Sequence, residues 1–177
     1  HHATDMTVGA IPANTANAFS DLAFGVYPLN RNASGTATVV AGSATSFNYN
    51  RSVTLSGNAS FFKSGLTNTD VIEPNAGSMF AVGTGNANLF AISSAVGNSS
   101  GLGASALFNG TTSSYGTGVA NTPNVFSMIG STTNVTGYSN GTAGIASGSI
   151  AARAAGSYTL GFGQNGSNAV FNNGSIA

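Results

Sequence analysis

The sequence predicts an all-β fold, a β-sandwich of the jelly-roll or immunoglobulin-like type that is built from many short strands. Helix formers other than alanine are rare, whereas Gly, Asn, Ser, Thr and Val are abundant. Short apolar or alternating runs recur along the whole chain, and turn-forming residues separate them. Many short strands at such spacing are typical of sandwiches and barrels.

The individual strands are expected where apolar residues alternate with polar ones or form short runs. In chain order these segments are Asp5–Ala10, Thr36–Ala41, Ser52–Ser56, Ser60–Phe62, Met79–Val82, Asn88–Ala95, Ala104–Phe108, Asn124–Ile129, Ser149–Ala152, Ser157–Phe162 and Ala169–Phe171. Between them lie GTGN, GNSSG, NGTTSSYGTG, GSTTN and SNGTAG, whose Gly and Asn residues favour turns. The best helical candidate is the short stretch Asn14–Leu22.

No shift in composition divides the chain, so residues 13–177 are expected to form a single β-rich domain. Residues 1–12 are expected to be an N-terminal extension. Within it TDMTVGA alternates polar and apolar residues and places Met6, Val8 and Ala10 on one face. Such a strand can complete the sheet of a neighbouring subunit, and these three residues are the candidate assembly contacts. An ordinary first strand that pairs within its own domain is the alternative.

A sequence echo raises a second possibility for the architecture. SGNASFF returns in altered form as TGNANLF, LGASALF and GSNAVF, and several Leu-Phe or Val-Phe pairs are 18 residues apart. A β-solenoid, which stacks like residues in successive coils, is the alternative that this spacing suggests. The residues between the echoes do not match, and every second strand recurs at this distance when a strand and its turn take about nine residues. The echo therefore favours regular strand spacing over a solenoid.

Charge is scarce in this chain. Charged residues make up 5% of it and the formal net charge is zero, whereas about 25% is usual in soluble domains. A hydrophobic content of 41% excludes a disordered linker, and a chain without net charge has little repulsion to prevent self-association. The scattered cations form no patch for nucleic acid, and no apolar run is long enough for a transmembrane helix. Cysteine is absent, which excludes disulfides.

No catalytic signature is present, so we expect no enzyme and no cofactor. The two histidines are His1 and His2, and no GxSxG motif occurs. Asp70 and Glu73, in TNTDVIEPNAG, form the only acidic cluster. Their oxygen atoms could bind calcium, and a solvated loop is the alternative.

Asparagines in Asn-X-Ser/Thr frames recur throughout the chain and are candidate N-glycosylation sites. They are Asn32, Asn50, Asn58, Asn98, Asn109, Asn134, Asn140, Asn165 and Asn173. The richness of the chain in Asn, Ser and Thr explains many of these frames by chance.

The composition resembles that of secreted surface proteins, including extracellular filament subunits and adhesin modules, and no motif ties it to one family. Together these observations predict a structural subunit of an extracellular, self-assembling filament, pilus-like fibre or sheath at the cell surface. Its partners would be copies of itself, joined into a homopolymer by β-strand complementation. The alternative is a monomeric surface adhesin or a carbohydrate- or ice-binding module, in which Tyr115 and Tyr138 are the candidate stacking residues.

Overall fold

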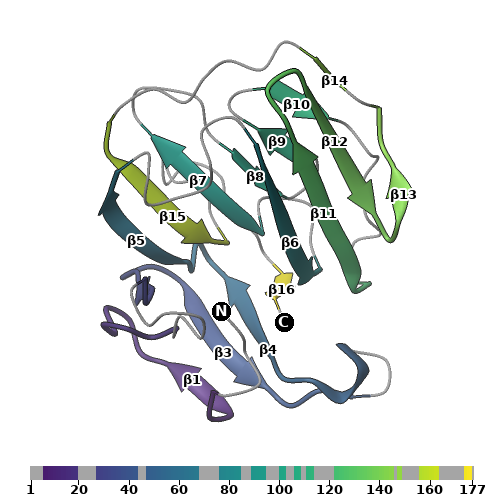
Figure 1. Cartoon of the computed structure of the whole chain (residues 1–177). Coiled ribbons are helices and arrows are strands. Elements are labelled where there is room, and N and C mark those ends of the chain that lie inside the picture. Colours follow the sequence, from purple (N-terminus) through teal and green to yellow (C-terminus); the bar gives the residue numbers. More distant parts are fainter. Residues whose placement is uncertain are drawn as a thin grey trace.

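Two antiparallel sheets make up the protein (Figure 1). The computed structural model describes residues 6–19, 27–43, 47–67, 76–84, 89–94, 100–102, 106–108, 111–113, 122–145, 147–148, 156–163 and 174–176. These residues include no α-helix and one 3-10 turn, η2 (Phe47–Tyr49). The predicted all-β sandwich is therefore confirmed.

The larger sheet has nine strands and the smaller has seven. The nine-stranded sheet runs in the order β1 (Gly9–Ile11), β3 (Thr36–Val40), β4 (Ser52–Ser56), β16 (Gly174–Ile176), β6 (Gly77–Gly83), β11 (Asn124–Gly130), β12 (Asn134–Ser139) and β13 (Thr142–Ala143), with β14 (Ser147–Gly148) also paired to β12. The seven-stranded sheet runs in the order β10 (Thr111–Ser113), β9 (Ala106–Phe108), β8 (Ser100–Leu102), β7 (Phe90–Ser94), β15 (Tyr158–Phe162), β5 (Phe61–Leu66) and β2 (Asn30–Arg31). The strand pairs in the described residues are all antiparallel, so the parallel rungs of a β-helix solenoid are not seen there.

The core lies between the two sheets and follows from the alternation of side chains along each strand. In β11, Phe126 and Met128 point inward and are buried, whereas Val125 and Ile129 point to the outer face. The same alternation in the other strands gives a core made largely of aliphatic and aromatic side chains, in which each full burial of a large side chain contributes about 1.5–3 kcal/mol. Its largest apolar members are Phe19, Leu29, Leu55, Phe61, Leu89, Ile92, Leu102, Phe126, Met128 and Tyr158.

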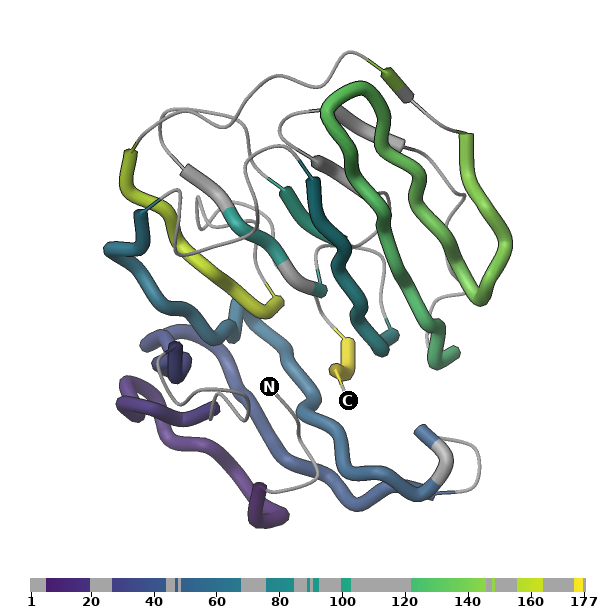
Figure 2. The backbone as a smooth tube through the Cα atoms, in the orientation of Figure 1, coloured from purple at the N-terminus to yellow at the C-terminus, as the bar shows by residue number. Residues whose placement is uncertain are grey.

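The last strand, β16, joins two groups of strands within the nine-stranded sheet, as the backbone trace in Figure 2 shows. It pairs with β4 over its whole length but with β6 only through Ile176 and Gly83. The Thr84 amide donates to the Ser175 carbonyl at 2.8 Å, and the Ser175 amide donates to Thr84 Oγ1 at 2.9 Å. A Cβ atom on Gly83 would lie 2.7 Å from the Ser175 carbonyl oxygen and 2.7 Å from Leu89 Cδ2. Only glycine therefore fits where β16 meets β6.

The sequence echo marks positions where one strand ends and the next begins. In its first copy, Gly57 and Asn58 have φ values of 58° and 66°, which form a tight turn between β4 and β5. Because β4 and β5 belong to different sheets, this turn is a corner of the sandwich. The other copies partly lie outside the described residues.

The strand predictions agree with the structure for the long apolar segments and fail for polar ones. β12 is absent from the expected strands: the sequence predicts turns at its two ends, in GSTTN and SNGTAG, and no element between them. The expected segments at 149–152 and 169–171 lie outside the described residues. The helical prediction for Asn14–Leu22 is wrong as far as Phe19: Asn14 and Asn17 have positive φ values, and Phe19 forms an antiparallel bridge with Leu29. Asparagine's tolerance of left-handed backbone, rather than alanine's helix propensity, decides this segment.

The predicted N-terminal strand is shorter than expected and pairs within its own chain. β1 begins at Gly9, and its three residues lie opposite Val39, Thr38 and Ala37 of β3. Ile11 packs against the core. Donation of this strand to a neighbouring subunit stays a prediction, and it would require β1 to leave β3.

A buried arginine organises the turn between β2 and β3. The Arg31 guanidinium donates through Nη1 to the carbonyl and the side-chain oxygen of Asn32, and through Nη2 to the carbonyls of Ser34 (2.7 Å) and Gly35 (3.0 Å). Burial lowers the pKa of this guanidinium from its usual value, yet arginine stays charged in proteins. In the described part of the chain its partners are amide and carbonyl oxygens rather than carboxylates. Arg31 thus replaces the water that these carbonyls would otherwise need.

Substituting Arg31 with alanine should therefore destabilise the fold. The change leaves three buried or partly buried carbonyls without their donor, and we expect the free energy of unfolding to fall by about 3 kcal/mol. Urea unfolding followed by circular dichroism measures it. Lys63→Ala, at another cation of the same sheet, is the control and should change stability by less than about 0.5 kcal/mol. Equal effects of the two substitutions would contradict this role for Arg31.

Candidate assembly interface

The outer face of β6, β11 and β12 is the surface with the clearest potential for binding. Cross-strand register arranges its outward side chains in three rows, which we call the assembly face. The rows are Val82, Val125 and Asn140; Phe80, Ser127 and Tyr138; and Ser78, Ile129 and Thr136. All nine are uncharged.

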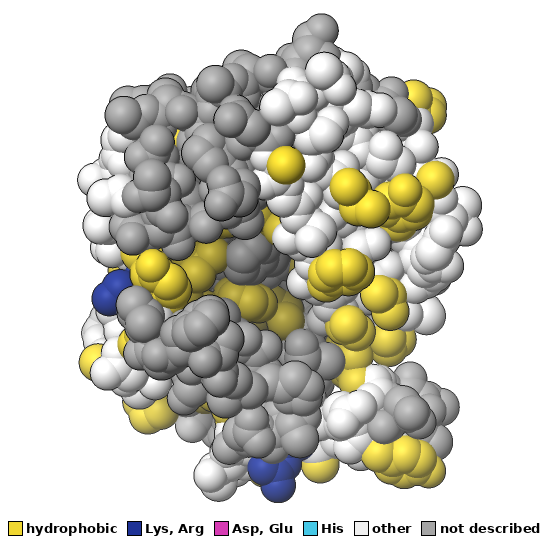
Figure 3. Space-filling model, in the orientation of Figure 1, with side chains coloured by type: hydrophobic (Ala, Val, Ile, Leu, Met, Phe, Trp, Pro, Cys, Tyr) yellow, Lys and Arg dark blue, Asp and Glu magenta, His cyan; other side chains and the backbone are white. Residues whose placement is uncertain are grey.

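Large apolar side chains are exposed at the centre of the assembly face. The exposed fractions are 73% for Phe80, 56% for Ile129 and 48% for Val125. Val125 and Ile129 flank Ser127, the residue opposite Phe80, so Phe80 is a diagonal neighbour of both. Figure 3 shows hydrophobic side chains gathered over this side of the molecule, with the visible Lys and Arg side chains elsewhere. A sheet face that is open to water normally carries polar residues at these positions.

Tight turns fix the strands that carry this face. At the β12–β13 turn, Asn140 and Gly141 have φ values of 50° and 80°, the pattern of a type I′ hairpin. The Asn140 side chain accepts a hydrogen bond from the Val125 amide at 2.8 Å and donates one to Asn124 Oδ1 at 2.8 Å. Asn124 in turn donates to the Thr122 carbonyl at 2.7 Å. Asn140 therefore holds the start of β11 in register with the end of β12.

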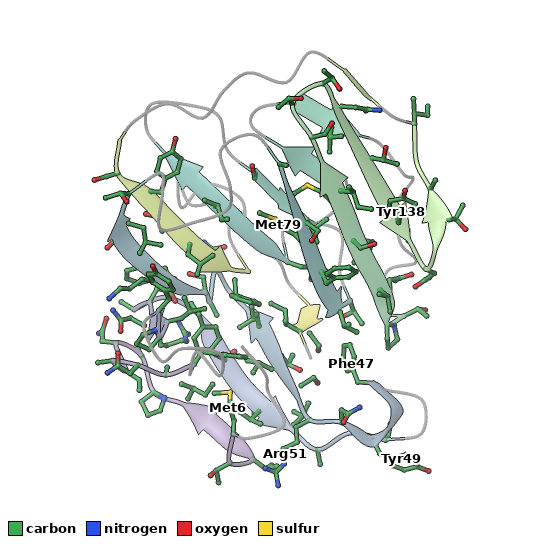
Figure 4. All side chains as sticks on the ribbon, viewed as in Figure 1. Met6, Phe47, Tyr49, Arg51, Met79 and Tyr138 are labelled. Carbon is green, nitrogen blue, oxygen red and sulfur yellow. The ribbon has the colours of Figure 1, made fainter. Side chains whose placement is uncertain are left out.

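Sequence reasoning placed strands at Met79–Val82 and Asn124–Ile129 but did not identify the face that they expose. A signal was present. SMFAV and NVFSMI are apolar at both parities of the strand, so apolar side chains must point to both faces of the sheet. Where apolar residues follow one another without alternation, both faces of the strand are apolar, and one of these faces is the assembly face. Tyr138, predicted as a stacking residue, does lie on this face and is half-buried; Figure 4 labels it.

The predicted assembly contacts are divided between the core and the surface. Met6 packs against the core, and its carbonyl accepts a hydrogen bond of 2.6 Å from Arg51 Nη1 (Figure 4). Val8 is 50% exposed, and Ala10 is exposed opposite Thr38. The three residues thus do not share one buried face within the chain.

The predicted calcium ligands Asp70 and Glu73 lie outside the described residues. No cluster of three or more His, Cys, Asp or Glu occurs in the part of the chain that the structure does describe. Calcium binding at Asp70 and Glu73 stays a prediction.

The predicted glycosylation sites differ in how far their side chains are already engaged. Asn32 donates to the Asn58 carbonyl at 2.8 Å and accepts from the Ser60 amide at 3.0 Å. Asn140 is bonded within the β11–β12 network, whereas Asn134 is exposed. Asn50 is also exposed and donates to the Phe47 carbonyl. Asn58 is exposed in the turn between β4 and β5. Asn98, Asn109, Asn165 and Asn173 lie outside the described residues, as does Tyr115.

Comparisons with protein-family models, curated proteins and solved structures found no match to the chain. Among the described residues, no helix has the length and apolar character needed to cross a membrane. The assembly face is therefore the basis for proposing a function.

Replacing Asn140 with alanine should loosen the assembly face without changing its apolar residues. The substitution removes two side-chain hydrogen bonds and places a Cβ-bearing residue without a polar side chain in left-handed backbone, so we expect a loss of about 2 kcal/mol in unfolding free energy. Thermal unfolding measures this loss. Asn134→Ala, at the exposed other end of β12, is the control and should cost less than about 0.5 kcal/mol. If the two variants unfold at the same temperature, Asn140 does not fix this hairpin.

Proposed function

We propose that this protein is a structural subunit that assembles with copies of itself into an extracellular filament, pilus-like fibre or sheath. The observation that carries the proposal is the assembly face, on which exposed Phe80, Val125 and Ile129 occupy one side of an antiparallel sheet. Contiguous apolar surface on a soluble domain marks a place where another molecule binds. Its function then lies in the assembly rather than in a chemical reaction.

Energy and charge both favour a second copy as the occupant of this face. Covering the three exposed side chains would contribute on the order of 3–5 kcal/mol before the costs of association. Identical surfaces that meet also bring identical charges together, and all nine residues of the assembly face are uncharged. Two such faces can therefore pack without desolvating an ion, which is the most costly part of burying polar surface. The zero formal net charge of the whole chain removes long-range repulsion as well.

A monomeric carbohydrate-binding or adhesin module is the second candidate, because the same face presents Tyr138 beside Thr136 and Ser127. Sugars stack on exposed aromatic rings and bond to nearby hydroxyl groups. Tyr138 is half-buried, however, and the most exposed aromatic ring of the face is Phe80, which has no hydrogen-bonding group. The face therefore fits an apolar protein surface better than a sugar.

Self-assembly can be tested by removing the apolar centre of the face. We expect the wild-type protein to form fibres or tubes visible by negative-stain electron microscopy and to sediment at physiological salt. Phe80→Ser combined with Ile129→Ser should raise the concentration needed for assembly by at least about tenfold, because most of the apolar contact area is lost. Both positions are exposed, so the monomer should keep its circular dichroism spectrum.

The control is Tyr49→Ser, which removes another exposed aromatic ring from the η2 turn, outside the assembly face. It should leave the assembly concentration unchanged. A wild-type protein that remains monomeric at high concentration would exclude the filament and leave glycan binding as the function to measure.

A further inference from the structure

We propose that the N-terminal strand β1 is exchanged between copies of the chain, leaving β3 of its own copy and pairing in a second copy with the edge of β6 that faces away from β11. This inference rests on the proposed self-assembly and names the segment and the edge that link one subunit to the next.

The donor segment is poorly matched to its place beside β3. β1 is an edge strand with three paired residues, and its neighbour on one side is β3. In an extended strand Met6, Val8 and Ala10 lie on the same side, yet Val8 and Ala10 are exposed to water in this arrangement. Met6 packs against the core, but Val8 and Ala10, two of the three apolar side chains on this side of the segment, are not buried. Such a strand buries more apolar surface if it pairs at a place where these side chains face a core.

The acceptor is the edge of β6 that faces away from β11. Residues 77–83 pair completely with β11, but on the opposite edge the pairing that the structure describes is limited to Gly83 with Ile176. Among the described residues this edge is therefore unpaired from 77 to 82, and an edge of this length is a template for one further strand. The inward side chains of β6 include Met79 and Ala81, both buried, so a strand beside them would also present alternate side chains to the core.

The surroundings of β6 suit an uncharged, narrow segment. On the side of β6 away from β11, Figure 3 shows the molecule hollowed, with hydrophobic side chains visible at the floor. The segment Met6–Ile11 reads MTVGAI and β6 reads GSMFAVG, so neither carries a charge. With Met6, Val8 and Ala10 facing inward, the donor would place its small and medium apolar side chains over that floor, and Thr7 would remain on the outer face.

A second copy, rather than the chain's own β1, is the occupant. The segment that follows β1 is tied to β2, because the Asn14 amide donates to the Asn32 carbonyl and the Arg31 amide donates to the Thr15 carbonyl. β2 lies at the edge of the seven-stranded sheet, and Figure 1 shows β1 and β6 in different parts of the molecule. Each copy therefore has a donor and an acceptor at separate places. Repetition of such a contact gives an open, head-to-tail chain of subunits.

A reversible disulfide lock tests the exchange directly, because the natural chain contains no cysteine. Ala10 and Thr38 are opposite each other in the β1–β3 ladder, so Ala10→Cys and Thr38→Cys in one chain place two thiols close enough to bond. Oxidation of the monomer should hold β1 on β3 and abolish assembly. Reduction of the same sample should restore assembly to the level of the wild type. Assembly that proceeds equally well with the lock closed would overturn the exchange and leave self-assembly through the assembly face intact.

A pair of charge substitutions tests which side of the donor becomes buried. Val8 and Thr7 are adjacent and both exposed in the monomer, so lysine at either position should leave its stability unchanged. After exchange Val8 faces the core and Thr7 faces water. Val8→Lys should therefore raise the assembly concentration by at least about tenfold, whereas Thr7→Lys should change it less than about twofold. Equal effects of the two substitutions would overturn the proposed orientation and with it the exchange at β6.

Discussion

The nine-stranded sheet depends on the contact between Ile176 of β16 and Gly83 of β6, because this is the point at which its two groups of strands meet. β16 has three residues and lies at the end of the chain, yet its neighbours β4 and β6 begin more than ninety residues earlier. The contact tolerates no side chain at Gly83, and Ile176 fills the core beside it. Pairing strands so distant in sequence requires the closure of long loops, which slows folding. The nine-stranded sheet is thus held together by pairing between strands that are far apart in the sequence.

The scarcity of charge affects the interior and the surface differently. Inside, Arg31 is the one fully buried cation of the described residues, and carbonyl and amide oxygens rather than carboxylates accept the hydrogen bonds from its Nη1 and Nη2 atoms. Outside, hydroxyl and amide side chains replace the usual charged residues, as in the paired hydroxyls of Thr36 with Ser56 and Thr54 with Ser175. Such a surface is wetted by water but does not repel a copy of itself. The scarcity of charge therefore favours the proposed self-association.

The sequence predicted the sandwich because the buried half of each long strand is strongly apolar. Val53, Leu55, Phe126 and Met128 lie on the expected strands and point inward, as alternation requires. β12 is absent from the expected strands because NVTGYS has few apolar residues to mark it, and its pairing with β11 and β13 makes it a strand. Strand order could not be predicted either, since the contact of β16 with β4 depends on long-range packing.

The sequence predicted two of the strands at the candidate site but not the face that they expose. Alternation in TDMTVGA predicted an assembly strand, but it could not show that Val8 would be exposed beside β3. The apolar outer face could have been predicted from the sequence, because β6 and β11 have apolar residues at both odd and even positions and therefore on both faces of the sheet. What the sequence could not supply was the register that brings Phe80 beside Val125 and Ile129. A patch on adjacent strands is a property of pairing, and pairing is decided by the tertiary structure.

The two proposed contacts use the same strand without competing for the same atoms. Exchange of β1 would engage the backbone N–H and C=O groups at one edge of β6, in the plane of the sheet. Contact through the assembly face would engage Phe80, which points away from that plane. Edge contacts extend a sheet along its hydrogen-bonding direction, whereas face contacts stack one sheet on another about 10 Å away. The two directions are roughly perpendicular, so one subunit could make both contacts at once, and each contact would stabilise the same assembly.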